Sequence, residues 1–203
     1  MLILAFDTAT LTATAALVRG GLLLGERAVP SRGLLAAVDG LLDEAGVVPG
    51  ELDGVACGVG PGSFTGVRSG LAHARGISLA LDIPVAGVST LAALVAGAAP
   101  AAIAVVDARR SEVFVLAGGS ESCLRPDELV FAPGTLLVGD GAVRYRELFE
   151  GAGGVIPADA DERHLPRARF HALLARSFGP ADEVLPVYLR APDAKKAVQA
   201  GAA

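Results

Sequence analysis

Runs of apolar residues near the start of the chain alternate with polar turns and predict three β-strands. Leu2 to Phe6 is apolar and ends at Asp7, and two further strand-like runs follow at 12–18 and 22–28. Arg19-Gly20-Gly21 separates those two runs, and short glycine turns of this kind connect antiparallel strands. The chain is therefore predicted to begin with a three-stranded meander.

The hydrophobic period becomes helical after Ser31. Apolar residues then recur three and four positions apart, namely Leu34, Leu35, Val38, Leu41, Leu42 and Ala45. This spacing predicts an amphipathic helix from Ser31 to Ala45. Ser31 is expected to cap the helix, and Gly46 is expected to end it.

The elements continue in the order strand, helix, strand, helix. The predicted ranges are a strand at 52–57, a helix at 65–81, a strand at 84–88 and a short helix from about Ser89. A dinucleotide-binding fold begins strand, helix, strand, whereas three strands precede the first helix here. The predicted order of elements is typical of the ribonuclease-H-like lobe of actin-type ATPases and sugar kinases, which is an analogy of fold alone.

A second lobe is predicted to start near Ile103. Residues 102–119 read AIAVVDARRSEVFVLAGG, which is again a strand, a turn and a strand. We therefore expect an α/β protein with a two-lobed, actin-like fold. Residues 1–102 would form the first ribonuclease-H-like lobe. Residues 103–203 would form a smaller second lobe, whose last segment can cross back to the first.

Composition narrows the class of protein. The 203 residues are 52% hydrophobic and 19% charged, enough apolar material for a globular core. The net charge of -5 and the 4% aromatic content argue against a surface that binds nucleic acid unaided. Cys57 and Cys123 form no C-x-x-C pair, so we expect a reduced, cytoplasmic protein.

Two apolar stretches, the N-terminus and residues 83–106, fit neither a signal peptide nor a membrane span. The N-terminus lacks the basic region of a signal peptide. The uncharged stretch 83–106 is interrupted by Pro84, Gly87, Gly97 and Pro100. Each uninterrupted piece is too short to span roughly 30 Å of hydrocarbon.

The glycine-rich stretch 58–76, GVGPGSFTGVRSGLAHARG, has no standard nucleotide-binding spacing. Gly62 and Gly66 enclose three residues rather than four, and no Lys-Ser/Thr follows, so the stretch is not a Walker loop. It is not a dinucleotide fingerprint either, because that motif has two residues before its last glycine and this stretch has three. A loop between strand and helix remains, with Gly60, Gly62, Ser63 and Thr65 placed to hold an anion or to let two backbones pack closely. The sequence favours packing and leaves anion binding open.

Several motifs together resemble the TsaB (YeaZ) family. They are FDTAT at 6–10, GPGSFTGVRSGLAHARGISLALDIPV at 60–85, GVSTLAAL at 87–94, VVDARRSEVF at 105–114, GDGA at 139–142 and PVYLR at 186–190. The resemblance implies a two-lobed actin-like fold. It also implies a non-catalytic partner of a paralogue, TsaD, in making threonylcarbamoyladenosine at position 37 of tRNAs that read ANN codons.

The same resemblance implies the partners. A small ATPase, TsaE, would join through the complex, and a separate enzyme, TsaC, would supply the activated donor. tRNA would be contacted only indirectly, and a homodimer can form when the chain is alone. No cofactor, metal or membrane is expected.

The residues themselves agree with a loss of catalysis. The paralogue binds a metal through paired histidines on a first-lobe helix, but the corresponding stretch 31–45 contains no histidine. The three histidines are His73, His164 and His171, of which only the last two are near each other in sequence. We therefore expect no metal site.

Two hairpins stand where an actin-type ATPase holds phosphate. Asp7 and Thr8 occupy the first, where a carboxylate normally works with Mg²⁺. The second contains Asp107, Arg109 and Arg110, long cationic side chains where small residues would be required. We interpret these positions as a degenerate phosphate site and both aspartates as turn-capping carboxylates, although the arginines could contact a phosphate.

The predicted first helix carries a smooth strip beside its apolar stripe. Gly33, Ala36, Ala37 and Gly40 form this small-residue strip, with Glu44 beyond it. Internal glycines cost a solvated helix about 1 kcal/mol each relative to alanine, so the strip is a candidate partner face. A chain generally rich in alanine and glycine is the open alternative. A small-molecule kinase and, less favoured, a metallopeptidase remain as other functions.

Overall fold

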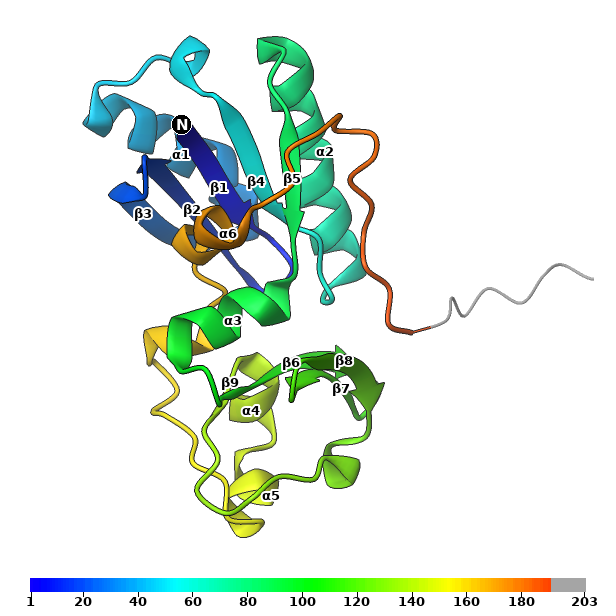
Figure 1. The fold of residues 1–203 in the computed structure, drawn as a ribbon. Helices are drawn as coiled ribbons and strands as arrows, with labels where there is room; N and C mark the ends of the chain where they lie inside the picture. The colour runs from blue at the N-terminus through cyan, green and yellow to red at the C-terminus, as the bar shows by residue number, and fades with distance from the viewer. Residues whose placement is uncertain (191–203) are drawn as a thin grey trace, which may run out of the picture.

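The structure, a computed structural model, describes residues 1–190 and contains two β-sheets, one in each lobe (Figure 1). The first sheet has the strand order β3-β2-β1-β4-β5. Its strands are β1 (Leu2–Asp7), β2 (Thr12–Arg19), β3 (Leu22–Pro30), β4 (Gly54–Gly58) and β5 (Val85–Val88). β1 pairs antiparallel with β2 and parallel with β4, so the predicted meander is followed by a crossover.

The second sheet repeats the start of the first. Its order is β8-β7-β6-β9, with β6–β7 and β7–β8 antiparallel and β6–β9 parallel. The strands are β6 (Ile103–Arg109), β7 (Glu112–Ala117), β8 (Ser120–Leu124) and β9 (Leu137–Val138). This repeated topology confirms the predicted two-lobed, actin-like α/β fold. The boundary at residue 102 stays a prediction.

Helices cover both sheets. They are α1 (Leu34–Ala45), α2 (Phe64–Leu81), α3 (Thr90–Ala98), α4 (Asp140–Arg144), α5 (Arg146–Gly151) and α6 (Ala168–Leu174). In the first lobe α1 and α2 lie on one face and α6 on the other, while α3 lies between the lobes (Figure 1). Among residues 1–190, no helix combines the length and the apolarity that a bilayer span requires.

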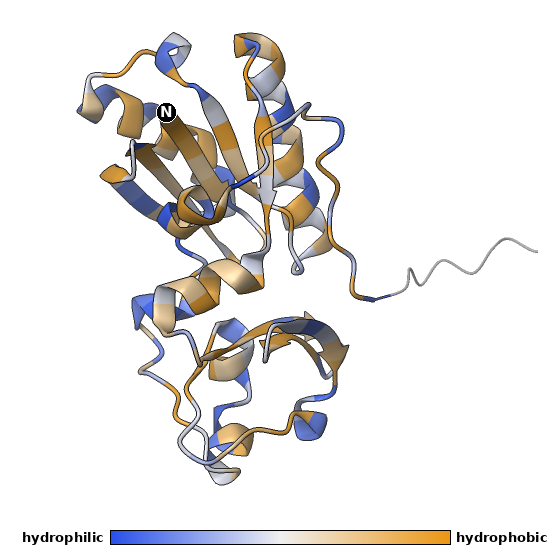
Figure 2. Cartoon of the chain, in the orientation of Figure 1, coloured by the Kyte–Doolittle hydropathy of each residue, from blue (hydrophilic) through white to orange (hydrophobic). Residues whose placement is uncertain are grey.

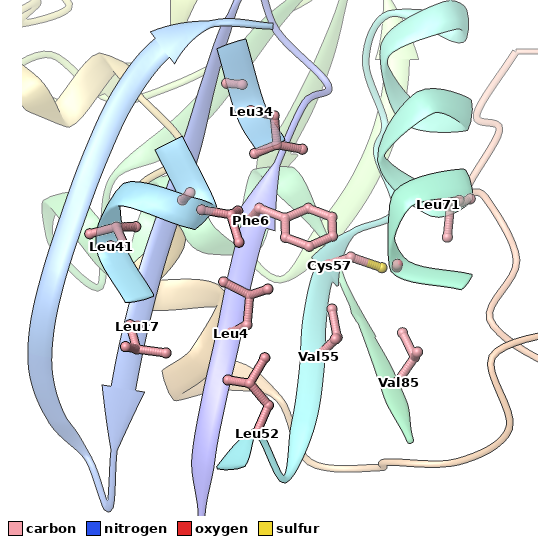
Figure 3. Packing of buried hydrophobic residues seen from close by; sticks show 14 of the residues in the cluster. Leu4, Phe6, Leu17, Leu34, Leu41, Leu52, Val55, Cys57, Leu71 and Val85 are labelled. Atoms are coloured by element: carbon pink, nitrogen blue, oxygen red, sulfur yellow. The ribbon is translucent and has the colours of Figure 1, made fainter. Parts of the chain in front are cut away.

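Alternation along β1 explains how one strand serves two faces. Leu4 and Phe6 point toward α1 and α2, where they join the main core with Val55 of β4 (Figure 3). Ala5 points to the opposite face, where α6 packs closely. Side chains alternate along a strand with period two, so large residues fill the wide helix layer and alanines admit α6. The inner strand β1 is accordingly apolar from Leu2 to Phe6 (Figure 2).

The predicted helix ends were right at one terminus of α1 and wrong at the other. Gly46 adopts the left-handed conformation at φ 62° and ends the helix, as predicted. Ser31 does not cap it, because residues 31–33 form a separate 3₁₀ turn. The Ser31 hydroxyl instead donates to the carbonyl of Leu11 at 3.2 Å, which ties α1 to the β1–β2 turn.

Candidate functional site

The turn after β1 carries a carboxylate whose two oxygens are both engaged. Asp7 Oδ1 accepts the backbone N–H of Ala9 at 2.7 Å, the bond expected of a turn-capping carboxylate. Oδ2 accepts the hydroxyl of Thr90 at 2.7 Å and lies 2.9 Å from Nε2 of His171. Asp7 and His171 are both completely buried. This carboxylate is therefore held by α3 and α6 inside the protein.

α6 is fixed at its start, which places His171 over Asp7. Arg167 Nη2 donates to Glu26 of β3 at 2.6 Å, and the Glu26 side chain is only 3% exposed. The hydroxyl of Thr14 donates to the carbonyl of Pro166 at 2.6 Å. These buried polar bonds hold the segment against β2 and β3, so the helix that follows presents His171 to the end of β1.

The two histidines that are close in sequence do not meet. His164 Nδ1 accepts the N–H of Gly139 at 3.1 Å, and its Nε2 lies 3.2 Å from the carbonyl of Pro157 in the second lobe. Among residues 1–190, no three His, Cys, Asp or Glu side chains converge where they could hold a metal ion. Cys57 is buried, and that burial, with a smaller effect from the charge of Asp7, raises its thiol pKa to about 12.

The glycine loop packs directly on the β1–β2 turn. A Cβ at Gly66 would lie 2.1 Å from the carbonyl oxygen of Thr8, and one at Gly62 would lie 2.5 Å from that of Ala9. Ser63 donates its N–H to Ala9 O at 2.7 Å, and the Thr8 hydroxyl donates to Gly66 O at 2.7 Å. These contacts support the packing interpretation, since the first hairpin itself occupies the space beside the loop.

The β6–β7 turn forms the second hairpin and places cations beside its carboxylate. Arg109, Arg110 and Ser111 are all left-handed, at φ 61°, 54° and 58°, which costs non-glycine residues roughly 1–2 kcal/mol each. Asp107 Oδ1 caps this turn by accepting the Arg109 N–H at 2.9 Å. Its Oδ2 lies 3.0 Å from the Arg109 guanidinium and 3.5 Å from that of Arg144.

A second aspartate, Asp140 at the start of α4, is hydrogen-bonded to the backbone of this hairpin. Asp140 Oδ1 accepts the backbone N–H of Asp107 at 3.0 Å. Burial raises the pKa of the Asp140 carboxyl, and the charge of Asp107 adds to that shift. The pKa of a carboxyl rises when its charged form loses solvation, so ionised Asp140 is a cost to the fold.

A cleft of about 1110 Å³ lies between the hairpins. Its lining includes Ala9 and Thr10 of the first hairpin, the starts of α1 and α2, and Asp107 to Arg110 of the second. Asp7 and Thr8 are not among the lining residues. The first-hairpin carboxylate is completely buried and bonded to Ala9, Thr90 and His171, so it is not presented to the cleft as a ligand for a cation bound there.

The last described segment, which includes the PVYLR motif, joins the two lobes. Val187 donates its N–H to Val59 O at 2.8 Å in the first lobe. Arg190 donates to the carbonyl of Ala108 at 3.0 Å in the second. The last segment is expected from the sequence to be able to cross back to the first lobe, but the residues that make these contacts could not be predicted, because an irregular segment has no hydrophobic period. The tail from residue 191 lies outside the described residues.

The small-residue strip of α1 lies beside strand β3. Gly33, Ala36, Ala37 and Gly40 line one shallow groove of about 440 Å³ with Arg27 and Val29 of β3. Its prediction as an exposed strip is wrong at Ala37, which is 6% exposed and forms part of the core-facing side. A residue at the border between the apolar stripe and the small-residue strip becomes buried when a neighbouring strand packs against that side of the helix. Glu44 pairs with Arg27 across the groove.

Comparison with known proteins adds a family to this geometry. The family model for TsaD, tRNA N6-adenosine threonylcarbamoyltransferase, matches residues 31–125. An uncharacterized protein of Mycobacterium tuberculosis is 37% identical over 205 aligned residues, covering 95% of this chain and 93% of that protein. The tRNA threonylcarbamoyladenosine biosynthesis protein TsaB of Escherichia coli is 39% identical over 124 residues, covering 56% of this chain and 53% of TsaB.

A solved structure matches nearly the whole chain. YeaZ from Pseudomonas aeruginosa superimposes with a TM-score of 0.74 at 32% identity, covering 93% of this chain and 99% of YeaZ. Agreement of fold, length and sequence over both lobes confirms the resemblance found in the motifs. This chain belongs to the TsaB (YeaZ) family, whose characterised relatives are named for tRNA threonylcarbamoyladenosine biosynthesis.

Proposed function

We propose that this chain is a non-catalytic subunit that binds and activates a TsaD-type paralogue in the threonylcarbamoylation of adenosine 37 of tRNAs reading ANN codons. The observation that carries this proposal is the position of Asp7. Its oxygens are committed to Ala9, Thr90 and His171 and are not presented to the cleft. A phosphate-transfer site needs acidic oxygens directed at Mg²⁺, so the fold of an ATPase is retained without its metal-binding carboxylate.

The groove between α1 and β3 supports a role in assembly. Gly33, Ala36 and Gly40 present little side-chain volume there, and a Cβ at Gly40 would have no contact closer than 3.9 Å. A partner helix can approach closely over such a surface. The outer face of α2 is similar, because Ala72 and Gly76 are exposed at its centre.

The remaining partners follow from the acidic chain and the family. With a net charge of -5, the chain is expected to bind tRNA only weakly at physiological salt, so tRNA contacts the assembly mainly through the paralogue. A TsaE-type ATPase joins through the complex, and the isolated chain can pair with itself. All of this takes place in the cytoplasm, where tRNA is modified.

Reconstitution tests the catalytic assignment. The purified chain, a TsaD-type paralogue, a TsaE-type ATPase, a TsaC-type enzyme, threonine, bicarbonate, ATP and unmodified tRNA are combined, and the modified nucleoside is measured by mass spectrometry. We expect product only when both the chain and the paralogue are present. Product formed without the paralogue, or undiminished product without the chain, would contradict the proposal.

A matched set of arginine substitutions tests the partner groove. Ala36→Arg and Gly40→Arg place a long charged side chain on the groove, whereas Ala152→Arg makes the same change at an exposed site in the second lobe. We expect the first two to lose co-elution with the paralogue at an unchanged melting temperature, because an unpaired charge is costly in a close contact. Equal co-elution of all three variants would place the partner on another surface.

No observation favours the two other functions. A metallopeptidase needs converging metal ligands, and residues 1–190 contain no such cluster. A small-molecule kinase needs carboxylates that face the cleft and are free to hold Mg²⁺. Asp107 and Asp140 both line the cleft, but Asp107 is paired with Arg109 and Asp140 accepts the backbone N–H of Asp107.

A further inference from the structure

The cleft between the hairpins combines cationic and exposed apolar side chains, and among the described residues it shares only Arg32 with the proposed paralogue groove. Five arginines and two aspartates line the cleft, without any lysine or glutamate. This is a positive surface on a chain of net charge -5. Two of the arginines, Arg32 and Arg68, pair with no carboxylate among residues 1–190.

Arg68 is held in a fixed orientation. Its guanidinium lies 3.7 Å from the ring centre of Phe64 and 5.9 Å from that of Tyr188. Its Nε donates to the Tyr188 hydroxyl at 3.0 Å. Stacking on aromatic rings fixes the plane of a guanidinium, and a planar guanidinium binds carboxylates in two-point geometry.

Apolar side chains surround these arginines and remain exposed. Leu11 is 77% exposed, Leu35 53%, Phe64 58% and Tyr188 47%, and all four line the cleft. Single exposed apolar residues are ordinary, but a group of them at one site marks an interaction surface. The cleft therefore presents both cationic and apolar groups, which is complementary to a segment that carries both acidic and apolar residues.

We propose that this cleft docks an acidic, apolar-containing segment of a partner protein, at a site that adjoins the α1–β3 groove through Arg32 and extends away from it to Arg68. The proposal rests on the assembly role above, since such a site needs a protein to fill it. The cleft volume of about 1110 Å³ exceeds the roughly 300–1,000 Å³ typical of small-molecule sites. The carboxylate of Asp7 that would hold a metal–nucleotide is completely buried. Both features favour a peptide over a nucleotide.

A labelled peptide tests the site without the paralogue. The probe is a fluorescein-labelled octapeptide that alternates Glu or Asp with Leu or Phe, and fluorescence anisotropy gives its dissociation constant on the full chain. We expect Arg32→Ala with Arg68→Ala to weaken binding about tenfold or more, because both charges meet the peptide directly. The control, Arg19→Ala with Arg176→Ala, removes the same charge from exposed positions outside the cleft lining.

A second pair of variants tests the apolar component. Leu35→Ser changes a cleft residue, whereas Leu79→Ser changes a leucine that is 88% exposed and outside the cleft lining. Only Leu35→Ser should weaken peptide binding. Equal effects of the arginine variant and its charge-matched control would overturn the proposal. So would ATP binding that requires Arg32 and Arg68 while the peptide does not bind. Peptide binding alongside a failed reconstitution would refute the proposed function and leave the docking site standing.

Discussion

Replacing His171 by alanine tests whether the Asp7 carboxylate depends on an internal side chain. The substitution removes the ring nitrogen 2.9 Å from Asp7 Oδ2 and leaves only the Thr90 hydroxyl on that oxygen. Both partners are completely buried, so the lost bond is not replaced by contact with bulk solvent. Removing one partner of this buried polar pair, together with the cavity that the ring leaves, costs about 3–5 kcal/mol of unfolding free energy.

That cost is large enough to measure in two ways. For a chain of this length each kcal/mol shifts the melting temperature by about 2–4 °C, so the expected fall is about 6–20 °C. Urea unfolding would give the free energy directly through a lower midpoint at unchanged slope. His73→Ala is the control, because its Nδ1 has no hydrogen-bond partner among the described residues. His73→Ala should cost much less.

Two results would refute this reasoning. A His171→Ala variant within about 1 kcal/mol of the wild type would show that Asp7 does not depend on the imidazole. Recovery of the lost stability by millimolar Mg²⁺ would be more damaging. It would mean that Asp7 can hold a cation once His171 is gone, and the proposal of a non-catalytic role would lose its main support.

Three further outcomes are expected. Gly66→Ala should destabilise the chain by roughly 1–3 kcal/mol in thermal unfolding, because the added Cβ would lie 2.1 Å from a backbone oxygen. The control is Gly76→Ala on the same helix, where an added Cβ meets no described atom within 4 Å. This control should be neutral or stabilising in the same measurement. Native alkylation at pH 8 followed by mass spectrometry should label Cys123 before Cys57, whose thiol pKa is about 12. The pKa of Asp140 is raised in the folded state. At pH values between the ordinary carboxyl pKa and this raised pKa, the folded state therefore binds more protons than the unfolded state, so the free energy of unfolding falls as the pH rises through this range. Asp140→Asn should therefore raise the melting temperature relative to wild type at pH 7, and the gain should vanish below about pH 4.

The sequence predicted the first lobe well because its elements have strong hydrophobic periods. α1 and α2 each bury one regular face against a common core, and β1 and β2 are recognisable as apolar runs that are buried on both faces. The second lobe was predicted only at 102–119, since β9 spans just Leu137–Val138 and α4 and α5 are short. Short elements give too few periods to distinguish helix from strand.

The candidate site could be located from the sequence but not understood from it. Motifs placed Asp7 and Asp107 on two facing hairpins, and both do cap their turns. The partner of Asp7 could not be predicted, because His171 is 164 positions away. It also lies on a short helix whose hydrophobic period is too weak to be recognised in the sequence. The prediction failed at Ala37 for a related reason, since its burial depends on how α1 packs against the rest of the lobe and cannot be predicted from the period of α1 itself.

Small residues serve two opposite purposes in this chain, and only their neighbours distinguish them. Gly62 and Gly66 are small because another part of the same chain touches them. Among residues 1–190, a Cβ at Gly40 would meet no atom closer than 3.9 Å and one at Gly76 would meet none within 4 Å, and helical glycine is costly in stability. A costly residue that nothing in the isolated fold requires is best explained by a contact made outside it. The first pair therefore belongs to folding, and the second pair directs attention to the surfaces where a partner is expected.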